Sequence, residues 1–157
     1  MYYQPDSIRE QLVAKYISGD GIEIGALCHP TKTDAHITFV DRFDKDRLHQ
    51  QYPEIPTDIM CDIDVVDDGE VLSSFDTESK DFIIANHFLE HCKNPLGTLE
   101  NWIRVLEHGG IIFCAIPYSN NPIDAGRPIT PFSHLEKDYY YPGNDFDHYM
   151  EYAKGDQ

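Results

Sequence analysis

Two histidines and a glutamate lie close together in the stretch NHFLEHC, residues 86–92. His87 and His91 are four residues apart, with Glu90 between them. On a helical turn this spacing places both imidazoles on one side, where they could bind a metal ion or supply a general base. The pair has no HExxH motif and no evident third ligand, which favours a base that takes a proton from a substrate hydroxyl. A hydrogen-bonded structural role for His91 is the alternative.

A second candidate site begins at EIGALCHP, residues 23–30, where an apolar stretch runs into Gly25. A glycine there lets the backbone approach a ligand closely, but the further glycines of a dinucleotide fingerprint are missing. Asp41 ends the next apolar stretch and is placed like a carboxylate that binds ribose hydroxyls, with a capping or surface role as the alternative. Residues 31–35 are too few for a crossover helix that would bind a pyrophosphate. A nucleoside ligand without phosphates fits better.

Strands and helices alternate in the hydrophobic pattern. Strands are predicted over residues 21–25, 36–41, 58–66, 81–86 and 110–117, and helices over residues 6–19, 44–52 and 94–109. Ile8, Leu12 and Tyr16 form the apolar stripe of the first helix, and Leu96, Leu99, Ile103 and Leu106 that of the third. The alternation predicts an α/β fold with a doubly wound, mainly parallel, Rossmann-like sheet of about five strands. Ligands of such sheets bind at the carboxyl ends of the strands, where the candidate residues would meet.

Length and charge narrow the possible functions. The 157 residues predict one domain, with an N-terminal helix in 1–20, a cofactor-binding core in 21–117 and a substrate-covering segment in 118–157. The formal net charge of -16 argues against nucleic-acid binding, and it either attracts a cationic ligand or reflects a solvated surface. No apolar run is long enough for a membrane span, and the start is polar. Four dispersed cysteines complete the pattern of a cytoplasmic protein.

The stretch DFIIANHFLEHCKNPLGTLENWIRVLEHGGIIFCAIP, residues 81–117, resembles class I S-adenosylmethionine-dependent methyltransferases. It is similar to the subgroup in which an EH helix follows the fourth strand and RVL–GG precedes a fifth strand ending in proline. IEIGALCHP, VDRF and DIDVVDDGE resemble a branch often found beside enzymes of cell-surface glycan assembly. The resemblance covers residues 20–152. It implies S-adenosylmethionine as cofactor and O-methylation of a sugar or another polar small-molecule or glycan precursor in polysaccharide biosynthesis.

The resemblance also implies which residues contact the cofactor. These are Glu23, Gly25 and Ala26 near its methionine part, Asp41 and Arg42 at the ribose, Asp64 and Val65 at the adenine, and Asn86 and His87 at the amino-acid end.

Catalysis would require a base near the methyl acceptor. His91 and His134 are the candidates, the latter in a polar set with Asp124 and Arg127, and no metal is expected. The tyrosines at 139–141 and 149 either stack on a sugar or pack against the sheet, and packing is the better interpretation. An alternative to an active enzyme is a non-catalytic subunit that binds the cofactor or a partner.

The C-terminal part of the chain departs from the family pattern. Members continue with two further strands, and we expect this chain to lack them. The strand at 110–117 would then be an edge strand that is apolar on both faces. We therefore expect a homodimer that buries this edge or the aromatic C-terminal segment. A monomer whose last segment covers the edge is the alternative.

Overall fold

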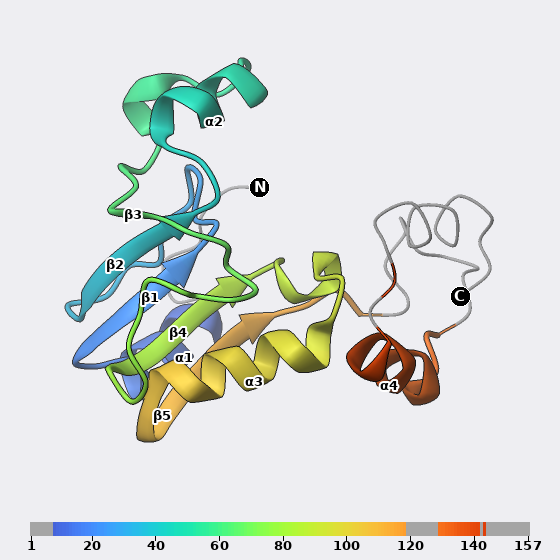
Figure 1. Ribbon diagram of the computed structural model, residues 1–157. Coiled ribbons are helices and arrows are strands. Elements are labelled where there is room, and N and C mark those ends of the chain that lie inside the picture. Colours follow the sequence, from blue (N-terminus) through green and yellow to red (C-terminus); the bar gives the residue numbers. More distant parts are fainter. Residues whose placement is uncertain (1–7, 119–128, 142, 144–157) are drawn as a thin grey trace.

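Five parallel strands form a single sheet in the computed structural model, which describes residues 8–118, 129–141 and 143 (Figure 1). The strands are β1 (Asp20–Ile24), β2 (His36–Asp41), β3 (Val65–Val66), β4 (Lys80–Asn86) and β5 (Leu106–Ala115). Their order, β3-β2-β1-β4-β5, reverses between β1 and β4. The parallel α/β sheet that the sequence predicts is confirmed, and its switch point lies between these two central strands.

Helices cover both faces of the sheet (Figure 1). They are α1 (Ile8–Tyr16), α2 (Lys45–Gln51), α3 (Pro95–Val105) and α4 (Phe132–Tyr140), with single 3₁₀ turns η1 (Thr57–Ile59) and η2 (Leu89–His91). Helix α3 lies on one face, α1 lies on the other, and α2 stands beyond the carboxyl end of β2. None of the described helices is long and apolar enough to cross a membrane.

Trp102 organises the core between α3 and the sheet. Its side chain is fully buried, and its indole N–H donates to the carbonyl oxygen of Gly69 at 2.8 Å. The predicted apolar stripe of this helix is wrong in part, because Ile103 is 64% exposed whereas Thr98, Trp102 and Val105 are buried. The large indole, with a partner for its N–H, sets the rotation of the helix.

Helix α1 turns a different face to the sheet from the one predicted. Val13 and Ile17 are buried against β4, whereas Ile8, Leu12 and Tyr16 are exposed. The turn at Gly19, where φ is +89° and the Asp81 carboxylate leaves no room for a Cβ, leads directly into β1. This tight entry directs Ile17 toward the sheet, and Val13 follows one turn earlier.

The segment from 58 to 66 is not the long strand that its alternating pattern predicts. Only Val65 and Val66 pair with β2, after the turn η1. The Asp64 side chain accepts a hydrogen bond from the backbone N–H of Phe39 at 2.8 Å, and its own N–H donates to the Phe39 carbonyl at 3.0 Å. Because a side chain replaces a backbone acceptor here, regular pairing starts only after Asp64.

Helix α3 ends earlier than predicted, at Val105, and β5 begins at the next residue. Lys80 pairs with Leu106 and Phe82 pairs with Ile111, so residues 107–110 form an irregularity in the ladder. Gly109, predicted to close the helix, has φ of +90° within this bulge.

The amino end of the sheet carries an ion-pair cluster around Asp20. Its carboxylate lies 2.8 Å from Lys80 Nζ and 2.7 Å from His36 Nδ1. The hydrogen bond from Lys80, followed by that from His36, lowers the pKa of Asp20 below its ordinary value of 3.8. The ionised form therefore stabilises the fold above that pH, and the contribution is lost as pH falls through the lower folded-state pKa.

We expect Asp20→Asn to lower the free energy of unfolding at pH 7 by less than about 1 kcal/mol, since the pair is partly exposed. The difference from the parent should shrink at a pH well below 3.8, as urea titrations at both pH values can measure. Asp62→Asn, which removes an exposed ion pair with Lys45, is the control and should change little at either pH. A deficit of Asp20→Asn that persists unchanged at low pH would contradict the electrostatic explanation.

Candidate functional site

A cavity of about 780 Å³ opens at the carboxyl edge of the sheet, at the switch point. Its walls come from the segments that follow β1, β2, β3 and β4, and from α2. The volume lies in the range of small-molecule sites, and the position is that of ligand sites in open α/β sheets. This cavity is the candidate functional site.

The first wall is the turn after β1. Gly25 has φ of +67°, and its N–H donates to the Val40 carbonyl at 3.0 Å. A Cβ at this position would meet only the Phe88 ring at 3.8 Å, so the backbone conformation rather than packing favours glycine. The bare backbone of Gly25 lines the cavity together with Leu27. Ala26, predicted beside it, is not among the lining residues, and its carbonyl accepts from the His29 N–H at 2.8 Å.

Glu23 stabilises the loop that follows β1 through hydrogen bonds to Thr31. It is almost completely buried, and its carboxylate accepts hydrogen bonds from the Thr31 backbone N–H at 2.9 Å and from Thr31 Oγ1 at 2.8 Å. Burial raises the pKa of Glu23, and the hydrogen bonds from Thr31 oppose this effect. The structure thus places Glu23 beside the loop that follows β1 and outside the cavity lining.

Asp41 ends β2 and lines the cavity beside Arg42. Burial raises the pKa of Asp41, while the backbone N–H groups of Phe43 and Arg42 stabilise its charged form. These donors belong to the next turn of the chain, so the carboxylate retains acceptor capacity toward the cavity. A pair of vicinal hydroxyls is a ligand group suited to it.

The third wall follows β3 and differs from the prediction. Asp64 is engaged with β2, and Val65 lies within β3, so neither lines the cavity. Residues 67–70 line it instead. Asp67 accepts hydrogen bonds from the Ser74 N–H at 2.7 Å and from Ser73 Oγ at 2.9 Å. Burial opposes the charge of Asp67, but these hydrogen bonds prevail and lower its pKa. The DDG triplet after the strand was the sequence signal for this turn.

The end of β4 brings a buried polar group to the same edge. The side-chain oxygen of Asn86 is buried and has no hydrogen-bond partner among the described residues. An unpaired buried acceptor is costly unless a ligand or water donates to it. His87, with φ of 55°, directs its exposed imidazole to Glu90, with 3.2 Å between Nδ1 and Oε1. Neither residue is among those that line the cavity.

The structure separates the two candidate bases. His91 lies in η2, is exposed and lines the cavity. Its backbone N–H donates to the Phe88 carbonyl at 2.9 Å. His134 lies in α4, where its Nε2 is 3.2 Å from the carboxylate of Asp138, and it is not among the lining residues. Asp124 and Arg127, the other members of the predicted polar set, lie outside the described residues.

Sequence reasoning missed the apolar lining of the cavity. Leu48 and Tyr52, from α2 and its C-terminal cap, face the cavity together with Phe88. Tyr52 presents a flat aromatic side chain on which a planar ring could stack. The signal was available, because Leu48 is the only large aliphatic residue of the helix KDRLHQQ and must mark its inner side.

The cavity is predominantly acidic. Its lining carries four carboxylates, those of Asp41, Asp67, Asp68 and Glu70, against two permanent cations, Arg42 and Lys93. Such a lining suits a cationic ligand. No cluster of three or more metal-binding side chains occurs in the described part of the chain.

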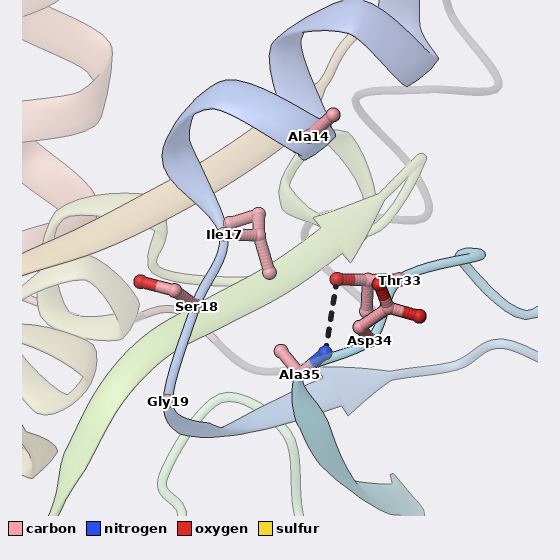
Figure 2. A pocket seen from close by; sticks show the side chains of 7 residues that line it. All are labelled: Ala14, Ile17, Ser18, Gly19, Thr33, Asp34 and Ala35. Carbon is pink, nitrogen blue, oxygen red and sulfur yellow. Dashed lines mark hydrogen bonds between the residues drawn. The ribbon is translucent and has the colours of Figure 1, made fainter.

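A smaller cavity of about 420 Å³ lies at the opposite, amino-terminal edge of the sheet (Figure 2). The C-terminal end of α1 and the turn at Gly19 form one side, and Thr33, Asp34 and Ala35 form the other. The Thr33 hydroxyl accepts a hydrogen bond from the Ala35 N–H at 3.2 Å. With Asp34 as its only charged lining group among the described residues, this cavity offers little chemistry.

Comparison with known proteins identifies one matching family. A family described as "Methyltransferase domain" matches residues 18–114. This range includes β1 to β4 and all but the last residue of β5. No match was found among curated proteins.

Three solved structures illustrate the likeness. A protein described as a methyltransferase, in complex with the Trm112 methyltransferase activator of Haloferax volcanii, is 20% identical with a TM-score of 0.44, over 60% of this chain and 43% of that one. The trans-methyltransferase CalH, in complex with SAH, is 17% identical with a TM-score of 0.42, over 60% and 30%. A protein of Methanococcus maripaludis described as an S-adenosyl-L-methionine-dependent methyltransferase is 14% identical with a TM-score of 0.49, over 90% and 65%. The chain thus spans less than two thirds of each of these proteins.

Proposed function

The chain belongs to the methyltransferase domain family, with S-adenosylmethionine as its cofactor, and we propose that it methylates a hydroxyl of a sugar or other polar glycan precursor. The observation that carries the proposal is the acidic cavity at the switch point, with the Asp41 carboxylate at the end of β2. We place the reaction in the cytoplasm, as a step of polysaccharide biosynthesis. The resemblance of the EIGAL motif to the glycan-associated branch supports this acceptor class.

The residues of the cavity fit the cofactor. Asp41 would accept hydrogen bonds from the ribose hydroxyls, with Arg42 beside it. Tyr52 and Leu48 would cover the adenine on the side of α2. The bare backbone of Gly25 would admit the amino-acid part of the cofactor. Asn86 ends β4 at the same edge but is not among the lining residues, so its unpaired oxygen would reach the ammonium group of the cofactor through a bridging water.

When bound, the cofactor supplies a methyl group activated by a positively charged sulfur. The acidic lining favours that charge, and the apolar wall of Leu27, Leu48 and Phe88 limits water at the reacting centre. The protein's main contribution is to hold donor and acceptor in line. His91, at the exposed rim, would accept the proton that the acceptor hydroxyl loses.

We expect Asp41→Ala to weaken binding of S-adenosylhomocysteine by about 10–100-fold, since hydrogen bonds to a charged group contribute roughly 1.5–3 kcal/mol. Isothermal titration calorimetry on the purified protein measures this directly. Gly25→Val should also weaken binding, because a branched side chain at φ of +67° strains the turn and intrudes on the ligand.

Asp46→Asn is the matched control, since it removes one negative charge from the exposed first turn of α2 without touching the cavity. Its affinity should equal that of the parent. If Asp41→Ala and Gly25→Val both bind like the parent, the ligand lies elsewhere. If the parent binds no S-adenosylhomocysteine, the proposed function itself fails.

The second proposal concerns assembly, and it rests on the outer edge of β5. The described sheet ends at this strand, where Ile116 is exposed and Ile111, Ile112 and Phe113 are only partly buried. We propose that a second copy of the chain covers this edge, because unpaired strand edges recruit other chains. A non-catalytic subunit that offers the edge to a protein partner is the alternative function.

Light scattering across a dilution series should therefore give the mass of a dimer. Ile116→Asp should shift the equilibrium toward the monomer, because a charge would be buried in the contact. A parent protein that stays monomeric at every concentration would contradict the homodimer.

A further inference from the structure

A backbone hydrogen bond joins two walls of the cavity, the loop after β1 and the segment after α2. The Cys61 N–H donates to the Leu27 carbonyl at 2.7 Å. Leu27 lines the cavity, and Leu48 and Tyr52 line it from the segment that leads to Cys61. This hydrogen bond therefore joins the two walls.

A cysteine flanks this hydrogen bond on each side. Cys28 follows Leu27 directly, and Cys61 is the donor residue itself. Both are free thiols and both are partly exposed, so a small oxidant can reach them. The hydrogen bond holds the backbone at Leu27, next to Cys28, against that of Cys61, and a disulfide between the two cysteines requires a Cα–Cα separation of about 4.4–6.8 Å.

The electrostatics of the two thiols also indicate that they are close together. Burial, with smaller contributions from the negative charges of Glu23 and of an ionised Cys28, raises the pKa of Cys61 to about 11. Cys61 is therefore protonated at neutral pH. A negative charge on Cys28 can raise the pKa of Cys61 only if the two side chains lie in each other's vicinity.

We propose that Cys28 and Cys61 form a reversible disulfide that links the first loop to the segment after α2 and so couples the cavity to the redox state of its surroundings. The oxidant is a low-molecular-weight disulfide such as oxidised glutathione. When cytosolic proteins form disulfides, these are usually transient and respond to the redox state.

The reaction proceeds by two thiol–disulfide exchanges. The Cys28 thiol loses its proton, and its sulfur attacks one sulfur of oxidised glutathione, which releases one glutathione as the thiolate that takes up a proton. The Cys61 sulfur, after losing its own proton, then attacks the Cys28 sulfur of the mixed disulfide and releases the second glutathione. Two cysteine thiols are oxidised to one disulfide, and one oxidised glutathione is reduced to two thiols. The high pKa of Cys61 favours Cys28 as the thiol that attacks first.

The bond is expected in a peptide map of the purified protein after incubation with oxidised glutathione. Under non-reducing conditions trypsin should yield residues 16–32 linked to residues 48–80, and reduction should separate them. The oxidised protein should melt about 5–10 °C higher than the reduced one, because the link restricts the unfolded chain. Cys61→Ser should abolish both effects, whereas Cys92→Ser, which leaves the pair intact, should preserve them.

A link between other cysteines, glutathione adducts that never close into a disulfide, or a lower melting temperature on oxidation would each overturn the proposal. The effect on the cavity rests on the proposed function, and we expect the oxidised protein to bind S-adenosylhomocysteine about tenfold more weakly. Equal affinity in both redox states would overturn this coupling. Binding in neither state would refute the proposed function, while the peptide map would still decide whether the disulfide forms.

Discussion

Trp102→Ala is expected to lower the free energy of unfolding by about 3–5 kcal/mol, the largest stability effect of any single substitution that we predict. The indole is fully buried between α3 and the sheet, and its N–H donates to the Gly69 carbonyl at 2.8 Å. The alanine variant leaves a cavity and an unpaired carbonyl oxygen, and the two penalties add. Urea denaturation followed by circular dichroism measures the change, since the chain's one tryptophan is lost in the variant.

Two further variants separate the contribution of the hydrogen bond from that of packing and test the orientation of α3. Trp102→Phe keeps most of the apolar volume but removes the donor to Gly69, so it should cost less than the alanine variant. Ile103→Ala lies on the same helix at a position that is 64% exposed, and its stability should stay within about 0.5 kcal/mol of the parent. A larger loss for Ile103→Ala than for Trp102→Ala would favour the orientation of α3 that the sequence pattern predicts.

That comparison shows why the faces of the helices were harder to predict than the fold. The parallel sheet follows from segments such as residues 81–86, which are apolar throughout their middle and which only a strand covered on both faces can bury. In α3, by contrast, apolar residues occur on more than one side, and the choice depends on whether Trp102 finds an acceptor for its N–H. That acceptor, Gly69, is distant in sequence. Tertiary contacts of this kind decide between two stripes that the periodicity leaves nearly equal.

The candidate site likewise contains residues that could be predicted from the sequence and residues that could not. Gly25, Asp41 and His91 were predicted because each lies at or after the end of a strand, and parallel strands bring their carboxyl ends to one edge. Asp64 is not among the lining residues because its side chain pairs with the backbone of β2, an interaction without a sequence signature. Tyr52 was missed because the path of α2 beyond the sheet is set by its packing in space. Strand ends are thus predictable from sequence, whereas the walls built by helices are not.

Asn86 illustrates a gain that only the structure provides. The sequence predicts a polar residue at the end of β4, but not that its oxygen is buried without a partner among the described residues. The backbone of Asn86 is held in register with Ala115 of β5, so the side chain is fixed at the switch-point edge. A ligand donor that reaches this oxygen would remove the penalty of an unpaired polar group.

His91→Ala is expected to reduce methyl transfer by about 100-fold or more while leaving the affinity for S-adenosylhomocysteine nearly unchanged. The imidazole lines the cavity at its exposed rim and makes no hydrogen bond within the described part of the chain. These observations favour a general base over a structural role, because a base must be accessible to the substrate and a structural histidine is normally hydrogen-bonded. The measurement is release of S-adenosylhomocysteine during turnover on a panel of sugar and glycan precursors, together with calorimetric titration of the cofactor product.

His134→Ala is the matched control for His91→Ala. Its ring lies 3.2 Å from the Asp138 carboxylate on α4 and outside the lining of the cavity, so its removal should leave turnover close to that of the parent. Added imidazole should partly restore the activity of His91→Ala, because the small base can enter the open rim and take the acceptor proton; a loss of packing would not respond to it. Unchanged turnover in His91→Ala would assign the proton transfer to another group. Equal losses in both histidine variants, without rescue, would mean that α4 contributes to the acceptor site. The assignment of His91 as the base from its position at the cavity would then fail.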